Sequence, residues 1–129
     1  MGGHRNAGHY RMSRIEDYKD AELWTVETTL RERYGRTVPY ELADSEVRLR
    51  ASDRDLNCCP IVYWEVNGCH FVIAKTGDRR YRAQFFYGGF EQFGTGIKEY
   101  DDLTECAVSL LQAQSDHERS REQQNQQDQ

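Results

Sequence analysis

The stretch IVYWEVNGCHFVIA, from Ile61 to Ala74, decides the fold of this chain. Two runs rich in β-branched and aromatic residues flank Asn67-Gly68, the dipeptide that type I′ hairpin turns prefer. A two-residue loop of this kind fixes the register of the two strands. The predicted cross-strand pairs are Val66 with Cys69, Glu65 with His70, Trp64 with Phe71 and Tyr63 with Val72.

A third strand is predicted from Arg80 to Tyr87, joined to the hairpin by a loop of residues 77–79. In the preferred register the facing residues are Ile73 with Ala83 and Phe71 with Phe85. Successive strand residues point to opposite faces, and this alignment makes one face of the meander uniformly apolar. That face comprises Val62, Trp64, Val66, Cys69, Phe71, Ile73, Ala83, Phe85 and Tyr87.

An amphipathic helix is predicted before the strands, from Asp20 to Tyr34. Apolar residues recur there at every third or fourth position, Asp20 is a candidate N-cap, and Gly35 is a candidate stop. The stretch Ser13-Arg14-Ile15-Glu16 also fits a capping box, so the start of this helix is left open.

A second helix is expected to start near Tyr100, where Asp102 and Glu105 resemble a capping box. Its apolar stripe contains Leu103, Cys106, Ala107, Leu110 and Leu111. Both helices are expected to cover the apolar face of the sheet.

Alternating residues between Thr37 and Ala51 predict two short strands, separated by turn residues at Asp44-Ser45. The predicted fold is therefore α+β and two-layered, in the order helix, two short strands, three-stranded meander, helix. The antiparallel sheet would carry both helices on one face.

The expected organisation is a flexible N-terminal segment over 1–17, one domain over 18–113, and a disordered polar tail over 114–129, with the alternative that the last helix continues into the tail by a turn or two. The tail, QSDHERSREQQNQQDQ, has no aliphatic or aromatic side chain to offset the entropy lost on ordering.

Composition excludes several functional classes. The chain has 129 residues, a net charge of -5, no long apolar run and no secretory signal pattern. These features predict a cytoplasmic protein that does not enter membranes. Cys58-Cys59, Cys69 and Cys106 match no common zinc spacing, so neither a metal nor a cofactor is predicted.

The sheet face opposite the helices is the candidate binding surface. It is predicted to carry Tyr63, Glu65, His70, Val72, Arg82, Gln84 and Phe86, a mixture of aromatic and charged residues that a solvated face does not need. Glu65 lies opposite His70 in the predicted register, so a cross-strand ion pair is expected between them.

The glycine-rich loop GGFEQFGTG, residues 88–96, matches no nucleotide-binding pattern. Phe90 and Phe93 more often fold back onto a core in such a loop, but exposed they would anchor a protein partner.

The leading hypothesis is a non-catalytic protein-binding module, an adaptor, chaperone or inhibitor, for a partner with a basic surface. An inhibitor encoded by a mobile element is one form of it. One alternative is single-stranded nucleic-acid binding, with Tyr63 and Phe86 stacking on bases and phosphates held by Lys75, Arg80 and Arg82. Another is a small enzyme that uses His70, Glu65 and a cysteine. Partner identity and oligomeric state are left open.

The order of helix, three main strands and helix is similar in outline to the double-stranded RNA-binding domain. That family places a lysine-rich cluster at the start of its second helix, where this chain has Glu99, Asp101 and Asp102. No family is therefore assigned.

Overall fold

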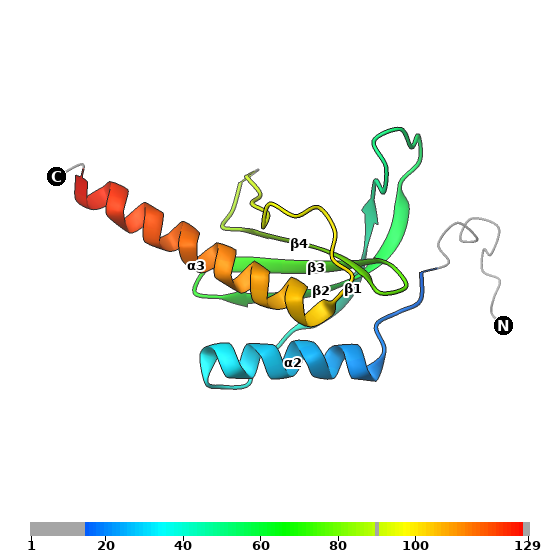
Figure 1. Ribbon diagram of the computed structural model, residues 1–129, viewed down its shortest axis with the longest axis horizontal. Helices are drawn as coiled ribbons and strands as arrows, with labels where there is room; N and C mark the ends of the chain where they lie inside the picture. The colour runs from blue at the N-terminus through cyan, green and yellow to red at the C-terminus, as the bar shows by residue number, and fades with distance from the viewer. Residues whose placement is uncertain (1–14, 90, 128–129) are drawn as a thin grey trace.

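The fold is a four-stranded sheet covered on one side by two helices (Figure 1). The computed structural model describes residues 15–89 and 91–127. Its elements are α2 (Asp20–Tyr34), β1 (Glu41–Val47), β2 (Asn57–Val66), β3 (Cys69–Gly77), β4 (Arg80–Phe86) and α3 (Leu103–Gln127). The strands are antiparallel and lie in the order β1-β2-β3-β4. The predicted α+β class and order of elements are confirmed.

The register of the meander is as predicted. Val66 pairs with Cys69 and Trp64 with Phe71, while Phe71 in turn pairs with Phe85. Asn67 and Gly68 have φ values of 52° and 81°, the pair of positive angles that a type I′ turn requires. The second connection differs in detail, because an irregularity near the end of β3 leaves only residues 78–79 between β3 and β4.

The two short strands predicted between Thr37 and Ala51 are a single strand, β1. The expected turn at Asp44-Ser45 is extended backbone that pairs with Pro60 and Cys59. The reason is that β2 begins at Asn57, before the predicted start at Pro60, and so offers a ladder partner along the whole of β1. Ladder hydrogen bonds outweigh the local turn preference there.

Helix α2 has the predicted bounds, but its N-cap is Lys19, and Asp20 is its first helical residue. The Glu22 carboxylate accepts a hydrogen bond from the Lys19 backbone N–H at 2.6 Å. Gly35 ends the helix with φ of 72°, as expected for a left-handed cap. Of the alternative earlier start, Ser13 and Arg14 lie outside the described residues, and residues 15–19 are not helical.

Helix α3 begins at Leu103, three residues after the predicted start near Tyr100, because Tyr100 forms a backbone bridge with Tyr81. Asp102 Oδ1 accepts a hydrogen bond from the Glu105 backbone N–H at 3.0 Å, so Asp102 caps the helix. Its length corrects the prediction of a disordered tail, since the helix continues to Gln127 (Figure 1). The first turns of this tail contact Tyr87, which lies outside it. The Gln114 amide donates to the Tyr87 hydroxyl at 3.2 Å, and the Arg121 guanidinium lies 4.8 Å from the centre of the Tyr87 ring.

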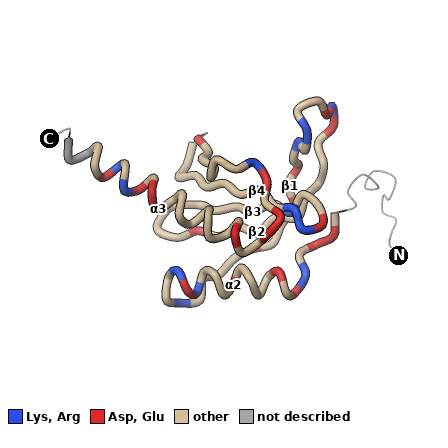
Figure 2. The backbone as a smooth tube through the Cα atoms, viewed as in Figure 1, with Lys and Arg blue, Asp and Glu red and all other residues tan. Residues whose placement is uncertain are grey.

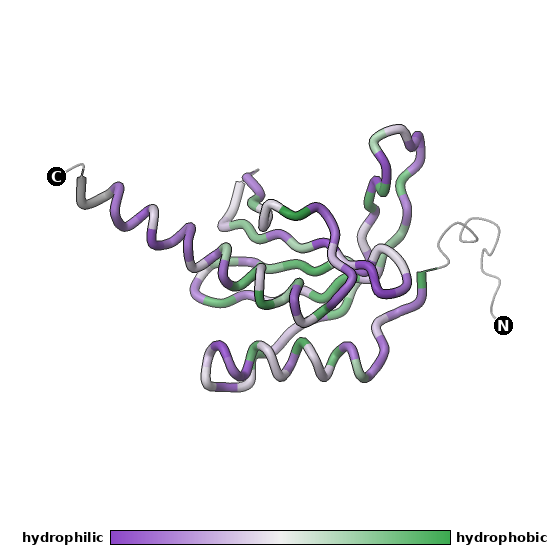
Figure 3. The backbone as a smooth tube through the Cα atoms, in the orientation of Figure 1, coloured by the Kyte–Doolittle hydropathy of each residue, from purple (hydrophilic) through white to green (hydrophobic). Residues whose placement is uncertain are grey.

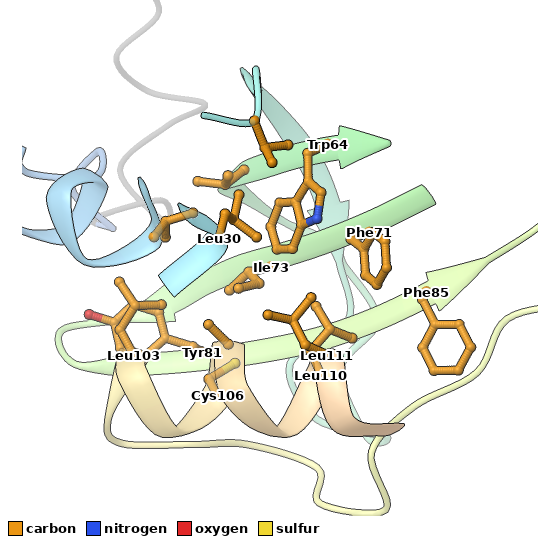
Figure 4. Packing of buried hydrophobic residues seen from close by; sticks show 14 of the residues in the cluster. Leu30, Trp64, Phe71, Ile73, Tyr81, Phe85, Leu103, Cys106, Leu110 and Leu111 are labelled. Carbon is orange, nitrogen blue, oxygen red and sulfur yellow. The ribbon is translucent and has the colours of Figure 1, made fainter. Parts of the chain in front are cut away.

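The core lies between the helices and the predicted apolar face of the sheet (Figure 4). Trp64 is 1% exposed and stacks on Phe71, with ring centroids 5.2 Å apart. The helices contribute Val26 and Leu30 from α2 and the predicted stripe from α3. Apolar residues accordingly gather in the strands and in the first half of α3, whereas its second half is hydrophilic (Figure 3).

One ion pair lies within this layer. Lys75 is 2% exposed, and its Nζ donates to Glu22 Oε1 at 3.0 Å and to the Asp17 carbonyl oxygen at 3.1 Å. The Tyr81 hydroxyl donates to the other oxygen of Glu22. The cluster fastens the start of α2 and the residues before it to β3 and β4.

Candidate functional site

Three rings form a continuous stack on the sheet face that the helices leave open. The ring centroids of Tyr63 and His70 are 5.8 Å apart, and those of His70 and Phe86 are 5.0 Å apart. The interplanar angles are 18° and 14°. The stack follows from the register, because His70 faces Phe86 directly and reaches Tyr63 on the diagonal. We call these three residues the aromatic ladder.

The ladder is fastened by a hydrogen bond of 2.6 Å between the Tyr63 hydroxyl and His70 Nδ1. Burial raises the pKa of Tyr63, and the nearby carboxylates of Glu65 and Glu41 raise it further. The phenol therefore stays protonated, and as the donor of this hydrogen bond it favours the imidazole tautomer that carries its proton on Nε2.

The predicted ion pair between Glu65 and His70 is not present among the described residues. The two face each other in the register, but the imidazole binds the Tyr63 hydroxyl instead. The Glu65 side chain is exposed and extends into solvent. The expectation was wrong because it considered only the directly opposite residue, whereas an aromatic side chain also reaches its diagonal neighbour.

A hollow of about 180 Å³ lies beside the ladder on the same face. Two of its lining residues adjoin the ladder in the register, since Val72 pairs with Tyr63 and Gln84 pairs with Val72. The lining residues are Ser45, Val47, Ile61, Val72, Ala74, Arg82, Ala83 and Gln84. Most of this lining is apolar or uncharged, so the open face offers a partner both rings and a shallow apolar recess.

Arg82 closes one end of the hollow. Its guanidinium donates to the backbone carbonyls of Arg48 at 3.0 Å and Leu49 at 2.7 Å, and its Nε lies 3.3 Å from Glu99 Oε2. The same Glu99 oxygen accepts a hydrogen bond from the Thr76 hydroxyl at 2.8 Å. These contacts join the loop that follows β1 to β4 across the width of the sheet. Arg82 is thus occupied within the fold.

The charged side chains beside Tyr63 are acidic. Glu41 faces Tyr63 across the β1–β2 pair, and Glu65 lies two residues further along β2 on the same face. The negative charges of both carboxylates raise the pKa of the Tyr63 hydroxyl. No ion pair engages either of them among the residues that the structure describes.

The glycine-rich loop folds back onto the helix side. Phe93 is half-buried, forms an isolated backbone bridge with Phe85, and stacks on the Phe85 ring at 5.3 Å. The His117 ring of α3 lies 4.3 Å from the Phe93 ring. Phe93 therefore does not share a surface with the ladder. Phe90 lies outside the described residues.

The four cysteines are free thiols. Burial raises the pKa of Cys106 to about 12 and that of Cys69 to about 11, and it also raises the pKa values of Cys58 and Cys59. A raised pKa disfavours the thiolate, which is the reactive form. The Cys69 side chain lies on the covered face, opposite to that of His70.

Sequence reasoning missed Glu41 and Ile61 as parts of the open face and placed Lys75 with surface cations. The alternation of β3 contained the signal for Lys75, because it shares the parity of Phe71 and Ile73 and therefore their covered face. Glu41 could be assigned only once the pairing of β1 with β2 was known.

No protein-family model matches the chain, and no curated protein or solved structure was found to be similar to it. Within the described ranges 15–89 and 91–127, none of the helices combines the length and apolar character needed to cross a membrane.

Proposed function

We propose that this protein is a non-catalytic binding module that receives a basic segment of a protein partner on the open face of its sheet. The observation that carries the proposal is the aromatic ladder with the carboxylates of Glu41 and Glu65 beside it. Lysine and arginine side chains are the groups that gain from aromatic faces and carboxylates together.

The geometry around Tyr63 supports this class of partner. One face of its ring is stacked against His70, while across the strand pair its neighbour is Glu41. A guanidinium or ammonium group placed over Tyr63 would therefore gain from the ring and from a carboxylate at the same time. The adjacent hollow can receive an apolar side chain from the same segment.

The nucleic-acid alternative shares the rings but has less support from the charges. Of the three cations it requires, Lys75 is buried against Glu22, and Arg82 is held by Glu99 and two backbone carbonyls. Phosphates would instead meet Glu41 and Glu65. The enzyme alternative lacks support from an activated thiol, because burial disfavours the thiolate forms.

A titration of the full chain with a fluorescein-labelled arginine- and tyrosine-containing peptide tests the proposal. We expect saturable, salt-sensitive binding that Tyr63→Ala/Phe86→Ala weakens about tenfold or more, since aromatic residues are frequent among binding hot spots and a loss of ~1.4 kcal/mol corresponds to a factor of ten. The matched control is Trp24→Ala on α2, which removes another aromatic side chain that is 64% exposed. Its affinity should equal that of the unmodified protein.

The charge requirement has its own pair of variants. Glu41→Gln/Glu65→Gln should weaken peptide binding, whereas Glu32→Gln/Glu105→Gln, which neutralises two exposed carboxylates on the helices, should have little effect. Equal loss in both doubles would indicate attraction by net charge alone. Tighter binding of a single-stranded oligonucleotide than of the peptide would contradict the proposal.

A further inference from the structure

The two edges of the sheet differ. The edge of β4 is partly occupied, because Tyr81 pairs with Tyr100 and Phe85 with Phe93 through mutual backbone hydrogen bonds of 2.8–2.9 Å. Strand β1 is the opposite outer strand and pairs only with β2 within the described part of the chain. All its residues from Glu41 to Glu46 are exposed. β1 therefore presents a free ladder edge.

The turn at Asn67-Gly68 determines which backbone groups lie on that edge. A two-residue hairpin loop makes Val66 and Cys69 a hydrogen-bonded pair, and such pairs recur at every second residue. Even-numbered residues of β2 therefore bond to β3, and odd-numbered residues such as Ile61 bond to β1. Because Ile61 faces Ala43, the odd-numbered residues of β1 bond inward. The outward N–H and C=O groups belong to Leu42, Asp44 and Glu46.

The side chains of these same three residues share one face. Their partners on β2 are Val62, Pro60 and Cys58, which have the parity of the covered face. Leu42 is nevertheless 54% exposed, so β1 extends beyond the cover that the helices provide. A strand added to this edge would meet one apolar and two acidic side chains at alternate positions.

Charge decides between possible occupants. β1 contains Glu41, Asp44 and Glu46 and no basic residue, and none of the three belongs to an ion pair among the described residues (Figure 2). A second copy of β1 would place acids against acids, which is unfavourable across a strand pair. The cations that follow β1, Arg48 and Arg50, belong to the next loop.

We infer that β1 binds an extended basic segment of the protein partner, which adds to the sheet as a fifth strand. The segment carries lysine or arginine at two alternate positions, opposite Asp44 and Glu46, and an apolar residue at the next alternate position, opposite Leu42. The inference rests on the proposed function for the class of partner, but it places that partner on different residues.

The probe is a labelled synthetic peptide in which lysine, lysine and valine alternate with threonine, and its binding to the full chain is measured by fluorescence anisotropy. A permuted peptide of equal composition, with the lysines adjacent, should bind about tenfold more weakly. Two further peptides are N-methylated on alternate backbone nitrogens, one at the odd-numbered positions and the other at the even-numbered positions. Only every second N–H of an added strand faces β1, so one of these peptides should not bind and the other should bind as the unmethylated peptide does. Equal affinities of the two N-methylated peptides would overturn the inference.

Asp44→Pro is the decisive protein variant. It removes the outward N–H of residue 44, while the hydrogen bonds from the odd-numbered residues of β1 to β2 are kept. We expect at least tenfold weaker binding of the alternating peptide. Asp44→Asn keeps the N–H and loses only the charge, so we expect a loss of about twofold to fivefold. Equal affinities of the two variants would contradict β1 as the docking edge.

The outcome also separates this inference from the proposed function. If Tyr63→Ala/Phe86→Ala abolishes binding of the alternating peptide and Asp44→Pro does not, the inference fails and the open face remains the site. If Asp44→Pro abolishes binding and the double variant of the ladder does not, the edge is the site and the proposed role of the ladder fails. Unfolding midpoints of the variants identify any loss of fold, and the N-methylated peptides then decide with the unmodified protein.

Discussion

Replacing Lys75 by methionine tests the polar cluster beneath the helices. The Lys75 Nζ lies 3.0 Å from Glu22 Oε1, and its side chain is only 3% exposed. Methionine fills similar space without a charge, so the Glu22 carboxylate keeps only the Tyr81 hydroxyl and the Lys19 backbone N–H as donors. Breaking a buried ion pair in this way costs about 3–5 kcal/mol. We expect a loss of about 3 kcal/mol at neutral pH, the lower end, because the Glu22 side chain is 15% exposed.

A double variant separates the charge from the packing. Glu22→Gln/Lys75→Met removes both charges, and the glutamine oxygen can still accept from Tyr81. The double variant should therefore be more stable than Lys75→Met alone, by at least about 1 kcal/mol, although it carries one substitution more.

The pH dependence has a defined sign. Burial pushes the pKa of Glu22 upward, but hydrogen bonds from Tyr81, the Lys19 backbone and Lys75 outweigh it and hold the pKa below the ordinary 4.5. The resulting stability is fully present above pH 4.5 and is lost as the pH falls through the lowered pKa of the folded state. In Lys75→Met the two contributions of Lys75 that lower the pKa of Glu22 are lost, so this pKa is higher than in the unmodified protein. The stability lost through the substitution is therefore larger at neutral pH, where the carboxylate is charged, than at low pH.

Urea denaturation of the three proteins, at about pH 4 and about pH 7, measures these differences in the free energy of unfolding. The cost of Lys75→Met should be smaller at the lower pH. A single-variant cost below about 1 kcal/mol at neutral pH, or a double variant no more stable than the single one, would refute the reasoning.

Three further predictions concern other parts of the fold. Asp102→Ala removes the acceptor for the Glu105 N–H at the start of α3, and the free energy of unfolding should fall by about 1 kcal/mol in urea titrations. Cys58, the one half-buried thiol, should react first with a thiol reagent, while the other three react only on unfolding; equal rates would contradict their burial. Tyr63→Phe should shift the neutral His70 ring away from the Nε2–H tautomer, which long-range ¹⁵N spectra report; an unchanged tautomer would show that the phenol does not set it.

The parts of the fold that local chemistry decides were predictable. Asn67-Gly68 defines a hairpin of fixed register, and the uniform apolar face then positions the third strand, so Phe71 meets Phe85 as expected. The burial of Trp64 on the helix-covered face of the sheet follows from the same alternation. Each of these features depends on residues close in sequence or on a simple periodicity.

The features that were not predictable depend on partners distant in sequence. Asp44 and Ser45 have turn preferences, but β2 holds them in a ladder. The first turns of the polar tail are ordered against Tyr87, which a composition argument does not consider. The role of Arg82 depends on carbonyls from the loop after β1, more than thirty residues away in the sequence.

Fluorescence quenching of a single tryptophan tests most directly which face of the sheet is covered, and the open binding face depends on that assignment. In Trp24→Phe, Trp64 is the only indole, and its 1% exposure predicts a blue-shifted emission that acrylamide scarcely quenches. In Trp64→Phe, the remaining Trp24 is 64% exposed and should be quenched strongly. Equal quenching of the two proteins under folded conditions would show that Trp64 is in contact with solvent and would contradict the whole assignment of faces.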